Sequence, residues 1–291
     1  MDTNKFTIKL YWEQIKKFKI SFFISLFCIP LAALALDTLL PYFLSQAIGG
    51  LSSQNQNIVI QNIITTSCIA LLGVSLNFAG FQALMRHEAN VRFELSKATF
   101  KRLIGKDLGF FSNEKIGSLT SRYIDFLRSH VTIQDLLIIR TLSFVISIGA
   151  GLIIVGSQSL LMAFILIILL TAIVLQVKFS INRRKPYRFA RKELMAESNG
   201  KVADALTNNL IVKTFAGEQT ELDHIDEVNS DYKTAFIKDL SRMGAEGSAR
   251  ILLMAITQIV SISICATLVS SGHMSIPVAV FMLIYLQRIA S

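Results

Sequence analysis

Six long apolar runs alternate with polar segments along this chain. They cover residues 20–48, 58–84, 136–156, 160–177, 251–269 and 274–291, and the last run ends with the chain. An α-helix needs about 20 residues to cross the roughly 30 Å hydrocarbon core of a bilayer. The first five runs are long enough to do so, and the sixth looks truncated. We therefore expect an all-α membrane protein with six transmembrane helices, in a sequence that looks like a fragment.

The basic residues fall almost wholly into three stretches between these runs. Residues 5–19, 86–128 and 178–250 hold nearly all of the 29 Lys and Arg residues. The short connections after the first, third and fifth runs hold none. Because Lys and Arg close to membrane spans stay on the cytoplasmic side, we expect a cytoplasmic N-terminus and three membrane hairpins.

The first 19 residues carry an amphipathic pattern that leads into the first span. Ile8, Leu10, Trp12 and Ile15 alternate with lysines. A helix with one apolar and one basic face lies in the membrane interface. No small-residue cleavage site follows at the distance typical of a signal peptide. Residues 1–19 are therefore expected to form an interfacial elbow helix.

The two long connections on the basic side, residues 85–135 and 178–250, far exceed the usual loop length of about 4–6 residues. Apolar residues recur in them at helical spacing, as in Val91, Leu95 and Ala98. If the second span continues unbroken to about Gly105, its length at 1.5 Å per residue is about 70 Å. We expect helical stalks that extend from the membrane into the cytoplasm.

The pattern breaks where each stalk has to turn. In the first stalk, Gly105 and Gly109 are expected to end a helix, and Ser112 to begin the next element after the apolar pair Phe110–Phe111. In the second stalk, the helical pattern continues through residues 192–213. A short transverse helix at the stalk tip is the simplest construction.

These tip sequences resemble a known family. Phe110-Phe111-Ser112, followed by the run from Ile116 to Arg122, is similar to the Phe-Phe-Asp and Thr-Gly-Glu-Leu-x-Ser-Arg pattern of type I ABC exporter transmembrane domains. The run from Ile211 to Glu218 is similar to that family's Val-Lys-x-Phe-x-x-Glu. The resemblance covers essentially the whole chain, and it implies the type I ABC exporter transmembrane fold.

The resemblance implies that the stalk tips are coupling helices that dock on ATPase domains. Carried over by residue match, the coupling residues are Ser112, Asn113, Glu114, Lys115, Ile116, Gly117 and Ser118 at the first tip, and Thr214, Phe215, Ala216, Gly217, Glu218, Gln219, Thr220 and Glu221 at the second. A merely solvated helical hairpin is the alternative, because charged helix faces usually are only that.

The same resemblance implies the partners. They are a second transmembrane domain, identical or paralogous, and ATPase domains that are fused after Ser291 or separate, which would bind ATP and Mg. The expected function is an ATP-driven export pathway for a lipid, peptide or hydrophobic compound, in the inner membrane of a bacterium, with membrane lipids around it.

The chain departs from the family pattern at three positions of the first tip. Ser112 replaces an Asp, Ile116 a Thr and Ser118 a Glu, so two carboxylates are lost. No Gly-x-x-x-x-Gly-Lys-Ser/Thr phosphate loop is present, and we expect no catalytic, cofactor or nucleotide-binding site in this chain. A motorless or degenerate membrane scaffold and an unrelated six-span channel therefore stay open as alternatives.

Polar residues inside apolar runs are the candidates for lining a pathway, because buried ionisable groups in membranes face the protein interior or water. Arg288 is equally well explained by a structural ion pair, and Asp37, between Pro30 and Pro41, by a local role at a bend. The full candidate set is Arg288, Gln287, Asp37, Asn77 and Gln82.

Other kinds of site are not indicated. The net charge of +9 comes from basic residues that flank membrane spans, without a nucleic-acid-binding motif, so no nucleic acid partner is expected. Cys28, Cys68 and Cys265 lie singly in apolar runs and predict neither disulfides nor a zinc site. The acidic run from Glu218 to Asp231 lacks metal-ligand spacing and is interpreted as helix-surface charge.

Overall fold

The computed structural model describes the backbone of residues 3–113 and 116–290, and within these ranges the side chains of residues 5–111, 119–120 and 122–286. Nearly all of this part is helical, and it contains no strand. The chain divides into two compact units. The first consists essentially of Met1–Ala163 and Ile262–Ile289, and the second of Phe164–Ser261. Each is described by itself.

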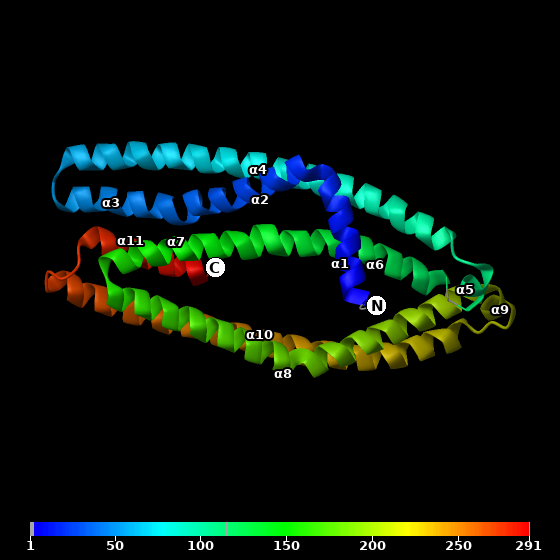
Figure 1. Cartoon of the computed structure of the whole chain (residues 1–291). Helices are drawn as coiled ribbons and strands as arrows, with labels where there is room; N and C mark the ends of the chain where they lie inside the picture. The colour runs from blue at the N-terminus through cyan, green and yellow to red at the C-terminus, as the bar shows by residue number, and fades with distance from the viewer. Residues whose placement is uncertain (1–2, 114–115, 291) are drawn as a thin grey trace. The chain divides into compact units, whose positions relative to one another are not determined.

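The first unit begins with the short helix α1 (Thr3–Ile15), a 3₁₀ turn η1 (Lys16–Phe18) and a helical hairpin (Figure 1). Its first arm is continuous through α2 (Lys19–Ala33), the π-helical η2 (Leu34–Leu39) and α3 (Leu40–Ser52), and its second arm is α4 (Gln56–Ile104). The remaining elements are α5 (Leu108–Asn113), α6 (Ile116–Asp135), the π-helical η3 (Leu136–Leu142), α7 (Ser143–Gln158) and α11 (Ile276–Ala290).

The second unit is a helical hairpin with a short helix at its tip (Figure 1). It is built from α8 (Leu160–Thr207), α9 (Asn209–Thr214) and α10 (Glu218–Ser270), except that the first four residues of α8 and the residues of α10 from Ile262 onward belong to the first unit. The helix α8 begins in an apolar segment, and α10 ends in one. Each of the two therefore has an apolar half and a charged half.

The structure confirms the expected all-helical plan. Five helical stretches of the described chain are long and apolar enough to cross a membrane: Lys5–Ser52, Gln56–Ile104, Arg122–Gln158, Leu160–Thr207 and Glu218–Ser270. The sixth, Ile276–Leu286, is apolar but shorter. The second span is unbroken as expected, because α4 runs from Gln56 to Ile104 with Gly105 as its C-cap.

The first span changes its helical winding between its two prolines. Pro30 lies inside α2 and Pro41 in the first turn of α3, and the six residues from Leu34 to Leu39 form a π-helix. Proline lacks the N–H that an α-helix needs, and a wider turn accommodates the resulting break in the hydrogen-bond ladder. The segment in which a bend was expected is thus a π-helix that contains Asp37.

Small residues let α4 pack closely against α2 and η2 in the first unit. A Cβ at Gly80 would lie 3.0 Å from the backbone nitrogen of Ile29, and one at Gly73 would lie 2.7 Å from the side chain of Leu36. Ile29 and Leu84 form a buried cluster with Ile138. Close packing of this kind holds helices together where apolar lipid offers no hydrophobic driving force.

The N-terminal helix packs against the stalk of the first unit. Leu10 and Tyr11 are buried with Leu95 and Leu127, and the Tyr11 hydroxyl donates a hydrogen bond of 2.7 Å to the carbonyl oxygen of Phe126. Most of the segment expected to form an interfacial elbow helix is helical, as α1 and η1, and it packs on the first stalk. Its position in the membrane interface stays a prediction.

The limits of the tip elements differ from the prediction. Gly109 does not end a helix but lies inside α5, because the carboxylate of Asp107 accepts a hydrogen bond of 2.9 Å from the backbone N–H of Phe110 and caps that helix. In the second stalk, the helix predicted through residue 213 ends at Thr207, and a separate helix α9 follows. Asn208 separates the two helices.

Candidate functional site

The tip of the second stalk is a short helix followed by a tight turn. After α9, the amide of Gly217 donates to the Val212 carbonyl oxygen at 2.8 Å, and the amide of Ala216 donates to the Lys213 carbonyl oxygen at 3.4 Å. This pair of bonds is the Schellman pattern of a helix end, in which glycine usually takes the left-handed position. Here Ala216 takes it, with φ of 48°. A non-glycine residue in this conformation is strained.

An ion pair closes the same turn. The Lys213 ammonium lies 2.8 Å from a carboxylate oxygen of Glu218, the first residue of α10. A hydrogen bond from Lys213 lowers the pKa of Glu218, and the position of this carboxylate at a helix N-terminus is electrostatically favourable. Gln219 also donates to Asp223 at 2.8 Å along the surface of α10.

The predicted coupling residues of the second tip span the end of α9, the turn and the start of α10. Of the eight, only Thr214 belongs to α9, and the others form the turn and the first residues of α10. At the first tip, Ser112 and Asn113 end α5, and Ile116, Gly117 and Ser118 begin α6. Glu114 and Lys115 lie outside the described residues.

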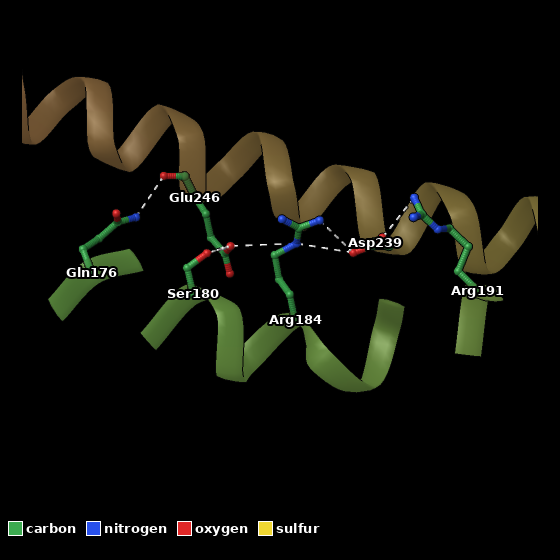
Figure 2. A network of polar contacts seen from close by, with 6 residues as sticks. All are labelled: Gln176, Ser180, Arg184, Arg191, Asp239 and Glu246. Carbon is green, nitrogen blue, oxygen red and sulfur yellow. Dashed lines mark hydrogen bonds and ion pairs between the residues drawn. The ribbon is translucent and has the colours of Figure 1, made fainter. Parts of the chain in front are cut away.

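A buried charge network ties the two helices of the second unit together (Figure 2). Asp239 of α10 is completely buried, and one of its carboxylate oxygens lies 3.1 Å from the guanidinium of Arg184 on α8. The other oxygen lies 3.1 Å from the guanidinium of Arg191, also on α8. A buried charge is tolerated when it is paired and hydrogen-bonded, and this carboxylate has a cation on each side.

The network continues along the hairpin toward the apolar halves of the helices (Figure 2). Ser180 donates a hydrogen bond to the carboxylate of Glu246, and Gln176 donates one of 3.2 Å to the backbone carbonyl oxygen of Glu246. Gln176, Ser180 and Arg184 are four residues apart, so they share one face of α8. We call this set, together with Arg191, Asp239 and Glu246, the charged brace.

The sequence pattern did not single out the charged brace. Arg184 and Asp239 are separated by 55 positions, and each is one charge among many in a basic stretch. The polar residues Gln176, Ser180 and Arg184, four positions apart on α8, were the one sign in the sequence of a polar helix face that could pack against another helix. Chemically, the brace holds two helices in register and presents no nucleophile or acid–base pair to solvent.

A second polar group lies among the apolar helices of the first unit. Thr38 in η2 lies 3.0 Å from the Ser147 hydroxyl of α7, and the Tyr285 hydroxyl of α11 donates to the Ser147 carbonyl oxygen at 2.9 Å. All three side chains are buried. Gly151 makes room for them, since a Cβ there would lie 1.9 Å from the Tyr285 ring.

The predicted pathway residues lie in different surroundings. Asp37 is half-buried beside Thr38 and within electrostatic range of Tyr285. Asn77 and Gln82 are exposed on α4 and are not brought together with Asp37. Gln287 and Arg288 continue α11 two and three residues beyond Tyr285, and their side chains lie outside the described ones. Thr38, Ser147 and Tyr285 are the members of this group that sequence reasoning missed.

No group of three or more His, Cys, Asp or Glu residues in the described part of the chain is arranged to hold a metal ion. The acidic residues at the start of α10 instead make surface contacts with Lys213 and Gln219.

Comparison with protein families shows which family shares this helical plan. A family model described as the ABC transporter transmembrane region matches residues 22–289. The chain belongs to the ABC transporter transmembrane region family. Being a member of that family with several membrane-length helices, it is an integral, multi-pass membrane protein.

A solved structure shares the fold of this ABC transporter transmembrane region. It is described as a bacterial Atm1-family ABC exporter with ATP bound, and it is similar with a TM-score of 0.72 at 18% sequence identity. The match covers 97% of this chain and 48% of that chain. The chain thus spans about half the length of the protein whose fold it shares.

Proposed function

We propose that this ABC transporter transmembrane region is the membrane-spanning part of an ATP-driven exporter. It forms the substrate pathway and converts closure of ATPase domains into alternating access. Support comes from the family match over residues 22–289 and from the fold shared with an exporter that was solved with ATP bound.

The observation that carries the proposal is the continuity of the second unit. The 53 residues of α10 form one unbroken helix, which at 1.5 Å per residue is about 80 Å long. The 48 residues of α8 run beside it, held by the charged brace. A stiff pair of helices moves as a body, so a displacement at the tip is passed toward the apolar half.

The assembly implied by this function contains two transmembrane domains and two ATPase domains. The second transmembrane domain is a copy of this chain or a paralogue, and the ATPase domains carry ATP and Mg. The tip residues are the proposed contacts with them. We place the N-terminus and the stalks in the cytoplasm, because the basic residues gather on one side of the spans. We place the assembly in the bacterial inner membrane, because the exporter that shares this fold is bacterial.

Cross-linking at the second tip tests the coupling. In the complete assembly, with the native cysteines replaced by serine, Thr220→Cys is joined to a cysteine on the ATPase domain by a reagent of fixed length. The cross-link yield is expected to change several-fold when ATP is added. Lys233→Cys is the matched control, since it is exposed on the same helix, roughly 20 Å farther from the tip.

A yield at Thr220→Cys that ATP leaves unchanged would exclude coupling through this tip. It would favour the motorless membrane scaffold, toward which the substituted residues Ser112 and Ser118 also point. Ion conduction by the purified chain without any ATPase partner would favour the channel.

A further inference from the structure

An apolar cavity of about 540 Å³ opens in the first unit, between α1, α2 and the continuous helix from α6 to α7. Trp12 and Ile15 of α1, Phe22 and Leu26 of α2, and Leu137 and Val145 line it. Pockets that bury a ligand of drug size have volumes of about 300–1,000 Å³. The cavity is therefore large enough for an extended hydrocarbon group.

The walls leave much apolar surface uncovered. Ile8 is 66% exposed, Leu137 56% and Val145 59%. His130 and Gln134 also border the cavity, but their side-chain nitrogen and oxygen atoms are buried in the protein. The surface offered to a ligand is thus hydrocarbon, and covering it with another apolar group is favourable by about 25 cal/mol per Å².

The helix that forms one wall is basic. Lys5, Lys9 and Lys16 lie on α1 or at its end, and the Lys16 ammonium lies 5.6 Å from the centre of the Trp12 ring. The Lys16 ammonium group therefore lies beside Trp12, a residue that lines the apolar cavity. Amphipathic helices of this kind lie at the level of lipid headgroups, where basic residues attract anionic lipids.

We propose that this cavity is a binding site for one acyl chain of an anionic phospholipid, whose headgroup lies beside Lys16. The acyl chain fits the hydrocarbon walls, and the phosphate fits the ammonium group. The lipid would fasten α1 to the bundle. The residues that line this cavity do not include Thr38, Ser147 or Tyr285, nor any of the predicted pathway residues.

The test uses Trp12, the only tryptophan of the 291 residues. Its fluorescence is recorded for the purified full chain in detergent while phospholipid with brominated acyl chains is added, because bromine quenches tryptophan only at close range. Quenching is expected to saturate near one lipid per chain. An anionic phosphatidylglycerol is expected to bind roughly tenfold more tightly than a zwitterionic phosphatidylcholine, which corresponds to about 1.4 kcal/mol.

Two filling variants and one matched control separate the site from general lipid contact. Val145→Phe and Ile133→Phe place a ring at the cavity and are expected to weaken quenching roughly tenfold or more. Val74→Phe has the same exposure as Val145, 59%, but lies on α4 away from the cavity, and should leave quenching unchanged. Lys16→Gln should keep the quenching and lose the preference for the anionic lipid.

Three outcomes would overturn the proposal. The first is quenching that never saturates and is equal in all variants, which indicates only general contact with lipid. The second is a Trp12 that neither lipid nor aqueous iodide quenches in the assembled transporter, because a partner chain covers the cavity. The third is equally tight binding of a brominated hydrocarbon without a headgroup, which indicates a site for apolar compounds.

Discussion

Asp239 shows how much a single side chain contributes to the second unit. It is fully buried, and its two carboxylate oxygens face Arg184 and Arg191 at 3.1 Å each. The guanidinium groups are themselves mostly shielded, with side-chain exposures of 18% and 27%. Removing one partner of such a pair leaves charge without compensation in a site that water hardly reaches.

We therefore expect Asp239→Ala to lower the free energy of unfolding by roughly 3–5 kcal/mol. The measurement is thermal and denaturant unfolding of the detergent-purified chain, followed by circular dichroism. Asp226→Ala, which removes an exposed carboxylate from the same helix, is the control and should change stability by less than about 0.5 kcal/mol. Equal effects of the two variants would show that the charged brace does not stabilise the hairpin.

Gly151 is the second residue whose identity the structure explains. A methyl group at this position would overlap the Tyr285 ring, so Gly151→Ala must displace that ring and break its 2.9 Å hydrogen bond to Ser147. Overpacking of this kind costs about 1–3 kcal/mol. Gly149→Ala, in the same helix, meets nothing within 4 Å and should be neutral or slightly stabilising. Similar melting temperatures for both variants would contradict the packing.

At the scale of elements, the sequence determined the helices better than their ends. Apolar runs and basic clusters predicted the spans and stalks, and the two prolines of the first span predicted a bend. Ser112 was expected to begin the element after Phe110–Phe111, but it lies inside α5, which Asp107 caps. Asp and Ser are both good caps, and the local pattern does not choose between them.

Contacts between elements were beyond prediction for a physical reason. Thr38 and Ser147 are separated by 109 positions, and Ser147 and Tyr285 by 138. Their meeting depends on how the helices rotate and slide against one another, and a single sequence does not fix either. The same holds for the charged brace and for the cavity beside α1.

Stiffness of the second stalk is the property of an element on which the proposed coupling depends. The paired substitution Ser230→Gly and Asp231→Gly places a flexible point in α10 between the tip and the charged brace, at a cost of roughly 1 kcal/mol per residue. We expect it to reduce substrate-stimulated ATP hydrolysis by the complete assembly several-fold, while the amount of protein in the membrane stays the same.

The matched control is Ser270→Gly with Ser271→Gly, at the other end of α10, where the helix already ends in a turn. This variant should keep its ATPase stimulation. Full stimulation in the mid-stalk variant would mean that a continuous α10 is not needed for coupling.

At the scale of the whole molecule, the family match accounts for the combination of long spans and long stalks. A helical bundle inside a membrane is stable without a helix as long as the 53 residues of α10. A helix of that length is needed only if it reaches from the bilayer to a partner outside it. The chain covers 48% of the exporter whose fold it shares. The activity of a whole exporter is therefore a proposal for this chain.

The most direct test of alternating access is the side from which position 37 can be reached. Asp37→Cys, in an assembly whose native cysteines are replaced by serine, is reconstituted in vesicles and treated with a membrane-impermeant thiol reagent from either side. Ser53→Cys, between the first two spans, serves as the control and should react only from the side opposite the stalks in every state. We predict that position 37 reacts from the stalk side without nucleotide and from the opposite side with ATP. Reaction from the same side with and without ATP would contradict the account.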